Sequence, residues 1–524
     1  MGDEERSDGA GNRSEAVEHC KENGGGHAEP PDPKASIKEK LKQPDYRSKV
    51  WRTVWLGASF WALGFAIGQR GPAFLDIQII TQTDVEAASF FFTSSSVGYL
   101  VGSLVAGVVY DKLNKSLLLL MCVLGMGVTT VALPWCAIYA MMIFIQFMVS
   151  LFGGGLDTAG NAELVRIWGK EGETAMQTIH FAFALGGIIG PLATEPFLTP
   201  TPEGSLHLTS TAAPSLYNST LSMLNSTMTA ESSNNTTNST IPAAPLTTIV
   251  HYAYLISGSI ILLIVVPFVV QLCTDRSEKR RQDHTDEKKS VTKQPLPTGV
   301  FIFVLFTFCS FYFLYCSVED TFAAYLSTFV VKHLHWSKTK AAQLTSAFWA
   351  SFAVGRFFGI FAVQVLSSVK LLFLLNLSLA VSLFSFLWFS QEGVGLGVWI
   401  CTVMIGASMS AIFPTGFSWM EEKFLRVTGR VASSILIASS SGTMVNPIVL
   451  GYLMQELTPM WFSYLLFGEA VLCFCTFLFL LVLSRFYIQK HYSVNIESKS
   501  LEIVIPTLNN EENIGDSTVA KSTL

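Results

Sequence analysis

The sequence predicts an all-α polytopic membrane protein with twelve transmembrane helices in two six-helix bundles. Of its 524 residues, 50% are hydrophobic and only 14% are charged, which excludes an ordinary soluble domain. Apolar stretches of roughly 20 residues, the length that crosses a bilayer, recur about twelve times. The two halves of the chain also match each other at a nearly constant offset, as a duplicated six-helix unit would.

The predicted spans follow one another closely, except where two long hydrophilic segments interrupt the series. They lie near 52–75, 87–110, 116–135, 137–166, 174–198, 249–273, 298–322, 341–366, 370–390, 396–418, 431–452 and 462–485. The resulting division is a disordered cytoplasmic tail over 1–50, a first bundle over 51–273, a cytoplasmic linker over 274–297, a second bundle over 298–485 and a cytoplasmic tail over 486–524. The first fifty residues hold no apolar segment of the signal-peptide kind, so the first span is expected to direct insertion.

Charge and sequons give the two hydrophilic segments opposite sides. Segment 199–248 contains no Lys or Arg and carries glycosylation sequons, which are used only on the lumenal or extracellular side. Their acceptors are Asn218, Asn225, Asn234, Asn235 and Asn238. Segment 274–297 is rich in Lys and Arg, which favours the cytoplasm. Both termini are then cytoplasmic, and the small net charge of -5 suggests no nucleic-acid partner.

The internal repeat rests on glycine and proline positions. An offset of 257 places Gly98 on Gly355 and Gly102 on Gly359. An offset of 256 places Gly186 on Gly442 and Pro191 on Pro447. These offsets relate helix 2 to helix 8 and helix 5 to helix 11, which favours a duplication of six spans.

The loop after the second span, "GVVYDKLNK", resembles the corresponding loop of the major facilitator superfamily. Gly107, Asp111, Lys112 and Lys115 match its glycine, acid and basic residues, and Asn114 stands where a second glycine is usual. The resemblance implies the major facilitator fold and transport by alternating access. We expect Asp111, with Lys112 and Lys115, to latch one conformation, against the alternative of a solvated loop of mixed charge.

A carboxylate lies deep in the fourth span, within "GGGLDTAGN". Asp157 precedes Arg166 by nine residues, which puts it roughly 13 Å from the cytoplasmic interface. An unpaired Asp at that depth costs on the order of 3 kcal/mol, so we expect it to face a polar cavity or a partner. Asn161 shares its helix face, and Gln177 and His180 of the fifth span reach a similar depth. A purely structural polar cluster is the alternative.

These two spans resemble the fucose:proton symporter branch of the superfamily and, among animal proteins, the sodium-dependent glucose transporter 1 group. Asp157 stands where that branch has a helix 4 Glu, and Thr158, Asn161 and Gln177 match in type. Helix 1 departs from the pattern, because Gln69 stands where sugar permeases have an acid. A single carboxylate beside hydroxyls suits a hard cation, so sodium is the expected coupling ion.

The predicted site therefore has a cation part and a sugar part. For the cation we predict Asp157, Thr158, Ser94 and Ser95. For the sugar we predict hydrogen-bonding and aromatic groups, namely Asn161, Gln177, His180, Gln69, Tyr315, Trp349 and Asn446. Each aromatic has a core or lipid-facing alternative. Glu319 and Asp320 of the seventh span have a solvated alternative, and Arg356 either pairs across the halves or extends to the interface.

The leading functional prediction is a secondary transporter of a hexose such as glucose or fructose, coupled to sodium, in the plasma membrane. A facilitative carrier, a monocarboxylate or organic-anion carrier using Arg70 and Arg356, and a non-transporting nutrient receptor are the alternatives. The C-terminal "KSTL" fits a ligand of a PDZ scaffold. The motifs HExxH and GxSxG, a P-loop and Cys/His metal spacings are absent from the sequence, so neither an enzyme nor a cofactor is predicted.

Overall fold

The computed structural model describes residues 41–168, 172–200, 247–278, 297–425 and 429–485, and most of them are helical. Eleven helices in these ranges are long and apolar enough to cross a membrane, and a further helix occupies the position predicted over 174–198. The all-α membrane class is confirmed. Contacts group the chain into a unit over Met1–Arg52 and a unit over Thr53–Leu524, which contains the bundle described below.

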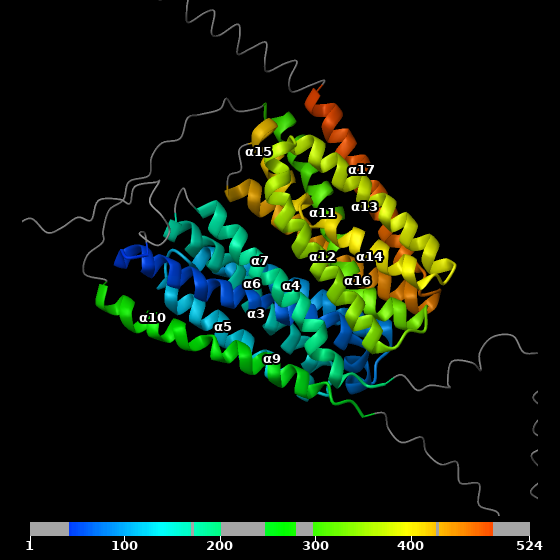
Figure 1. Cartoon of the computed structure of the whole chain (residues 1–524), viewed down its shortest axis with the longest axis horizontal. Helices are drawn as coiled ribbons and strands as arrows, with labels where there is room; N and C mark the ends of the chain where they lie inside the picture. The colour runs from blue at the N-terminus through cyan, green and yellow to red at the C-terminus, as the bar shows by residue number, and fades with distance from the viewer. Residues whose placement is uncertain (1–40, 169–171, 201–246, 279–296, 426–428, 486–524) are drawn as a thin grey trace, which may run out of the picture. The chain divides into compact units, whose positions relative to one another are not determined.

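The helices of the first half extend from Pro44 to Glu278 (Figure 1). They are α3 (Pro44–Thr81), α4 (Val85–Val109), α5 (Lys115–Ala132), η1 (Leu133–Trp135), α6 (Tyr139–Trp168), α7 (Gly172–Thr194), η3 (Glu195–Phe197), α9 (His251–Leu263) and α10 (Val265–Glu278). Two boundaries correct the prediction. The first helix begins at Pro44, inside the segment expected to be a disordered tail, and α10 continues to Glu278, inside the predicted linker 274–297. Helices α9 and α10 together form the sixth span near the predicted position.

The second half contains six further spans. They are α11 (Thr298–Lys332), α12 (Lys338–Val365), α13 (Ser368–Gln391), α14 (Gly395–Met409) with α15 (Ile412–Lys423), α16 (Gly429–Glu456) and α17 (Trp461–Leu483). Helix α11 continues ten residues beyond the predicted end at 322, because the following residues remain apolar and pack inside the bundle. The sequons and the predicted tail 486–524 lie outside the described residues.

The packing follows the internal repeat. Between the halves, α4 packs against α16 and α7 against α12, and the repeat exchanges these two contacts (Figure 1). A Cβ on Gly98 would lie 2.3 Å from the Phe147 carbonyl oxygen on α6, and one on Gly355 would lie 2.8 Å from the Ala407 carbonyl oxygen on α14. The matched glycines therefore bring helix 2 onto helix 4 and helix 8 onto helix 10.

The other matched glycine pair repeats the pattern. A Cβ on Gly186 would meet the Trp61 carbonyl oxygen of α3 at 2.0 Å, and one on Gly442 would meet the Phe313 carbonyl oxygen of α11 at 2.4 Å. Helix 5 thus approaches helix 1 as helix 11 approaches helix 7. Absent side chains let the backbones touch, which is how membrane helices pack without a hydrophobic driving force.

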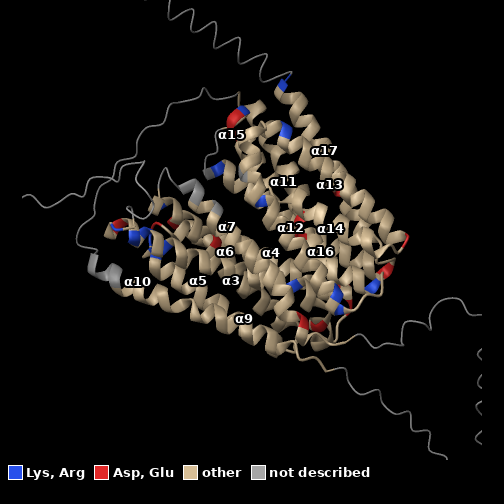
Figure 2. Cartoon of the chain, viewed as in Figure 1, with Lys and Arg blue, Asp and Glu red and all other residues tan. Residues whose placement is uncertain are grey.

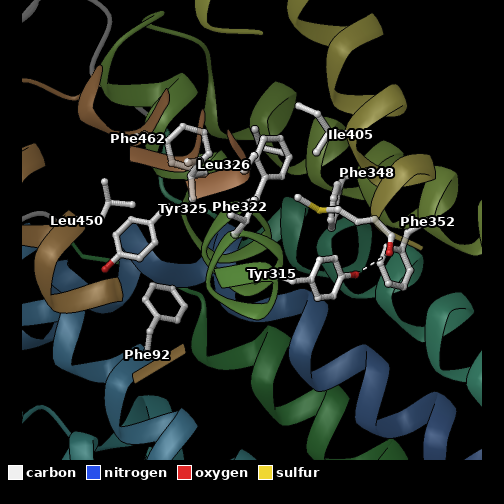
Figure 3. Close-up of a cluster of buried hydrophobic side chains, with 14 of the residues drawn as sticks. Phe92, Tyr315, Phe322, Tyr325, Leu326, Phe348, Phe352, Ile405, Leu450 and Phe462 are labelled. Carbon is white, nitrogen blue, oxygen red and sulfur yellow. Dashed lines mark hydrogen bonds between the residues drawn. The ribbon is translucent and has the colours of Figure 1, made fainter. Parts of the chain in front are cut away.

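Aromatic side chains fill the interior of the second half and reach across to the first. Tyr325 of α11 lies between Phe92 of α4 and Leu450 of α16 (Figure 3), and its hydroxyl donates to the Pro447 carbonyl at 3.1 Å. Nearby Tyr315 donates to the Met409 carbonyl at 2.6 Å. Backbone oxygens satisfy both of these buried hydroxyls, as is usual for buried polar groups.

Candidate solute and cation site

A cavity of about 330 Å³ lies between the two halves. Helices α3, α4, α6 and α7 line it from the first half, and α11, α12, α15 and α16 line it from the second. The volume falls within the range that holds small organic ligands. Most charged residues of the described chain lie near helix ends, whereas a few lie within the bundle (Figure 2). Those few matter most for binding.

Five charged residues line the cavity. Arg70 of α3 and Asp157 of α6 come from the first half, and Glu319 and Asp320 of α11 with Arg356 of α12 come from the second. Three carboxylates against two guanidinium groups leave one formal negative charge. A charged lining inside a membrane protein is costly unless a ligand or a partner balances it. The lining of the described residues therefore has an excess of one carboxylate over guanidinium groups.

Neutral oxygens hold both guanidinium groups. The Arg70 Nη1 donates to the Ser95 hydroxyl at 2.5 Å, and Ser95 in turn bonds Ser150 at 2.7 Å. The Arg356 Nε donates to the Ser410 carbonyl at 3.3 Å, and its guanidinium lies over the Phe352 ring. Within the described ranges, none of the five charged residues forms an ion pair of 4.0 Å or less. Their charges remain free to act on what enters.

Two prolines and a helix break explain why backbone carbonyls inside the bundle are free to accept hydrogen bonds from side chains. Pro414 has no N–H, so the carbonyl of Ser410, four residues earlier, lacks its helical donor. The break between α14 and α15 adds to this opening, and Arg356 fills the vacancy. Pro447 likewise frees the Thr443 carbonyl of α16, which accepts from Ser96 of α4 at 3.0 Å. Proline residues thus leave carbonyl oxygens inside the bundle that side chains of neighbouring helices can bond.

Asp157 projects into the cavity from a tightly packed stretch of α6. Its Oδ1 accepts from the Asn161 Nδ2 at 3.0 Å, and the Tyr99 hydroxyl is its other hydrogen-bonding neighbour. A Cβ on Gly154 would lie 2.2 Å from the Tyr99 carbonyl oxygen, and one on Gly160 would lie 2.6 Å from the Phe60 ring. These glycines serve helix packing. Their packing places Tyr99 beside the carboxylate.

One end of the bundle is closed by a buried ion pair. We call it the sequon end, because segment 199–248 connects there. The Lys338 Nζ of α12 lies 2.8 Å from the Asp76 Oδ2 of α3. The other oxygen, Oδ1, accepts from the Thr199 N–H at 3.0 Å and from the hydroxyls of Thr199 and Thr248 at 2.6 and 2.7 Å. Two halves and both ends of the sequon segment therefore meet at one carboxylate.

Further bonds reinforce this closure. The Ser346 hydroxyl of α12 donates to the Ile188 carbonyl of α7 at 2.8 Å. The Thr93 hydroxyl of α4 donates to the Met444 carbonyl of α16 at 3.0 Å. Together with Asp76 and Lys338, they form a seal between the halves on the sequon side of the cavity. The structure is thus a state closed at the sequon end.

The family model described as Major Facilitator Superfamily matches residues 54–199 and 240–447. The chain belongs to the major facilitator superfamily. Sodium-dependent glucose transporter 1 of Homo sapiens is 31% identical over 402 residues, covering 76% of this chain and 72% of that protein. Sodium-dependent glucose transporter 1A of Mus musculus is 30% identical over 396 residues, covering 76% and 88%. The inward-open xylose transporter XylE from E. coli has a TM-score of 0.58 at 10% identity, covering 83% of this chain and 96% of that chain, and shows the shared fold.

Within this superfamily fold, the predicted cation residues separate into two groups. Asp157 and Ser95 line the cavity. Ser94 instead donates to the Ile143 carbonyl at 2.7 Å, and the methyl group of Thr158 faces Gly107. Neither of these two is among the residues that line the cavity. The adjacent Ser96 lies where we expected Ser94 to lie.

The predicted sugar residues separate in the same way. Trp349 lines the cavity, and Asn161 lies behind Asp157. His180 packs edge-on to Phe60, and Gln69 is buried with neither amide atom paired in the described chain. Tyr315 bonds the Met409 carbonyl and Asn446 bonds the Glu469 carboxylate, so both face the second half's interior. The side chain of Gln177 lies outside the described residues.

The superfamily loop between α4 and α5 is exposed. Asn114 caps α5 by accepting from the Ser116 N–H at 3.0 Å. This cap explains why an asparagine stands where a glycine is usual. Asp111 and Lys112 are exposed, and the Lys115 Nζ lies 5.5 Å from the centre of the Tyr110 ring. The latch remains a prediction for another conformation.

Sequence reasoning missed Tyr99 and left Glu319 and Asp320 undecided. Their positions within apolar spans were visible, but helical periodicity does not tell which helix each one faces. Glu319 and Asp320 share the cavity with charged residues of the other half, of which Arg70 lies more than two hundred residues away in the sequence. Only the assembled bundle shows them facing one space.

Proposed function

We propose that this chain is a sodium-coupled secondary transporter of a hexose such as glucose or fructose, working by alternating access. The observation that carries the proposal is the cavity between the halves, whose lining has one surplus negative charge. One sodium ion would neutralise that charge, and an uncharged sugar would leave the balance undisturbed. The similarity to proteins named sodium-dependent glucose transporter 1 supports the same function.

The cavity lining has the chemistry that sugars need. Trp349, Phe352 and Phe413 supply flat apolar faces for the C–H side of a ring. Around them, the charged residues and the hydroxyls of Ser439 and Ser440 can exchange hydrogen bonds with sugar hydroxyls. A site built to bond hydroxyl groups discriminates strongly against analogues that lack them.

The cation would bind beside Asp157. This carboxylate shares the cavity with the hydroxyls of Ser95, Ser96 and Tyr99. A formal negative charge with several neutral oxygens is what a hard cation prefers. Arg70 already bonds Ser95, so its guanidinium competes for one of these oxygens and would shift as the ion enters.

A seal at one end and a cavity on its inner side support alternating access. In this proposal the sequon end is extracellular, the linker 274–297 and both termini are cytoplasmic, and the protein acts in the plasma membrane of cells, apical in epithelia. The C-terminal "KSTL" would recruit a PDZ scaffold. Surface labelling of tagged termini in intact and permeabilised cells tests this orientation, and PDZ binding by a tail peptide tests the partner.

Transport by purified full-length protein in liposomes tests the function. We expect labelled glucose to accumulate under an inward sodium gradient and to equilibrate without concentration when choline replaces sodium. Equal uptake in both buffers would leave a facilitative carrier. Exchange of lactate in place of glucose would favour the monocarboxylate alternative, which the surplus negative charge argues against. Absence of flux with retained sugar binding would favour a nutrient receptor.

A further inference from the structure

A further carboxylate, Glu469, lies within a membrane span but apart from the solute cavity. Glu469 is in α17, eight residues after Trp461, so it sits about 12 Å along the helix from that end. It is not among the residues that line the cavity. An ionisable residue at such depth is rare, and it usually takes part in ion movement.

Among the described residues, the only hydrogen-bonding partner of Glu469 is the Asn446 amide. That amide nitrogen faces more acceptor oxygens than it has hydrogens. The Asn446 Nδ2 lies 3.0 Å from the Glu469 Oε2, 2.9 Å from the Thr321 Oγ1 and 3.3 Å from the Ser317 carbonyl oxygen. An amide nitrogen carries two hydrogens, so it cannot serve three acceptors fully. The three oxygens come from α11 and α17 and converge on α16.

The same corner holds an unused oxygen. The Ser317 hydroxyl is buried, 1% exposed as a residue, and has no hydrogen-bond partner in the described chain. It lies where a side chain on Gly442 would be, since a Cβ there would be 2.4 Å away. Gly442 precedes Asn446 by one helical turn, so the space is on the face of α16 that carries the amide.

We propose that Glu469, Asn446, Thr321 and Ser317 form a second sodium site. Turning the Asn446 amide by 180° exchanges its nitrogen and oxygen, which are interchangeable in shape. Its Oδ1 then joins the Glu469 carboxylate, the Thr321 hydroxyl and the Ser317 carbonyl around one point. Four oxygens with a single formal charge suit a monovalent hard cation. In the structure, the Asn446 amide nitrogen contacts the other three oxygens, and after the turn the ion would replace it as their partner.

The site is coupled to the solute cavity through α11 and α16. Thr321 lines both the cavity and the proposed sodium site, and it directly follows Asp320. Pro447 follows Asn446, lines the cavity and accepts from Tyr325. A sodium ion at Glu469 would therefore tie α11, α16 and α17 together beside the solute. The coupling role rests on the proposed function, whereas sodium binding itself does not.

Direct binding of radioactive sodium to the purified full-length protein, without sugar, tests the site. Glu469→Gln keeps the shape and removes the charge, and we expect it to lose one bound sodium ion per chain. Thr321→Val removes one neutral oxygen at nearly constant volume, and we expect about tenfold weaker sodium binding at this site. Glu456→Gln, at the end of α16 and exposed, is the matched control and should bind as the unmodified protein does.

The outcomes separate this site from the proposed function. An unchanged sodium count in Glu469→Gln and an unchanged affinity in Thr321→Val would overturn the site. If Glu469→Gln does not fold, as judged by gel filtration and thermal unfolding, the affinity of Thr321→Val decides alone. Should the unmodified protein bind sodium through Glu469 yet move no hexose in liposomes, the site stands and the proposed function fails.

Discussion

The Lys338 ammonium of α12 and the Asp76 carboxylate of α3 form a buried ion pair of 2.8 Å between the two halves, with the residues 9% and 0% exposed. Two threonines that bracket segment 199–248 occupy the second carboxylate oxygen. Both oxygens of the Asp76 carboxylate are therefore paired with donors. Opening the sequon end requires that this whole arrangement separates.

The first prediction concerns that pair. Asp76→Asn leaves the Lys338 charge buried without its partner, so we expect the free energy of unfolding to fall by about 3 kcal/mol. The double variant Asp76→Asn with Lys338→Met removes both charges and should recover most of the loss. Thermal unfolding midpoints in detergent measure the effect. A single variant as stable as the unmodified protein would show that the pair does not hold this state.

The second prediction concerns the coupling carboxylate. Asp157→Asn removes the charge at the proposed cation site while keeping the size of the side chain, so glucose uptake should lose its dependence on sodium. Uptake is measured in liposomes over a series of sodium concentrations. Glu392→Gln, an exposed acid after α13, provides the control. Uptake that still rises with sodium in the Asp157 variant would remove Asp157 from the coupling mechanism.

The third prediction follows from the charge balance of the cavity. Arg356→Gln raises the surplus from one negative charge to two, so the sodium concentration for half-maximal glucose uptake should fall by about tenfold. Lys423→Gln serves as the control, because Lys423 pairs with Glu422 on the exposed end of α15. If Arg356→Gln instead abolished lactate uptake by an otherwise lactate-transporting protein, the anion carrier would be supported.

The fourth prediction concerns the packing that places Asp157. A Cβ on Gly154 would lie 2.2 Å from a backbone oxygen of α4, so Gly154→Ala should destabilise the protein by about 2 kcal/mol. Gly57→Ala is the matched control, since no atom lies within 4 Å of its added Cβ. The control should be stabilised by about 0.5–1 kcal/mol through higher helix propensity. Thermal unfolding compares them, and equal midpoints would contradict the packing argument.

Much of the architecture was predictable from the chain. Span length and hydropathy located the helices, because the thickness of a bilayer sets the length of an apolar segment. The repeated glycines predicted a duplication of six spans, and the structure shows them meeting the equivalent neighbours in each half. Helix ends were predicted less well. Apolar residues continue along α11 beyond the predicted end at 322, and Pro44 begins a helix in a polar stretch.

The candidate site was predictable only in part. Asp157, Ser95 and Trp349 were predicted correctly and line the cavity. They could be predicted because carboxylates, hydroxyls and indoles stand out in apolar spans. Ser94 and Asn446 were expected there but face elsewhere. Neighbouring serines on one helix point in different directions, and the direction that becomes the cavity depends on where the opposite half lies.

The sequence by itself determined the membrane class, the repeat and the presence of a carboxylate, Asp157, deep in helix 4, because these depend on composition and on spacing along one chain. The tertiary structure decided which charges share a space. It brings Arg70 and Asp157 of the first half into one cavity with Asp320 and Arg356 of the second. Beside that cavity, Glu469 and Thr321 share the Asn446 amide. Such relations depend on the distances between helices. Those distances are set only when the bundle assembles, by close contacts at glycines and by hydrogen bonds to carbonyls that proline leaves free.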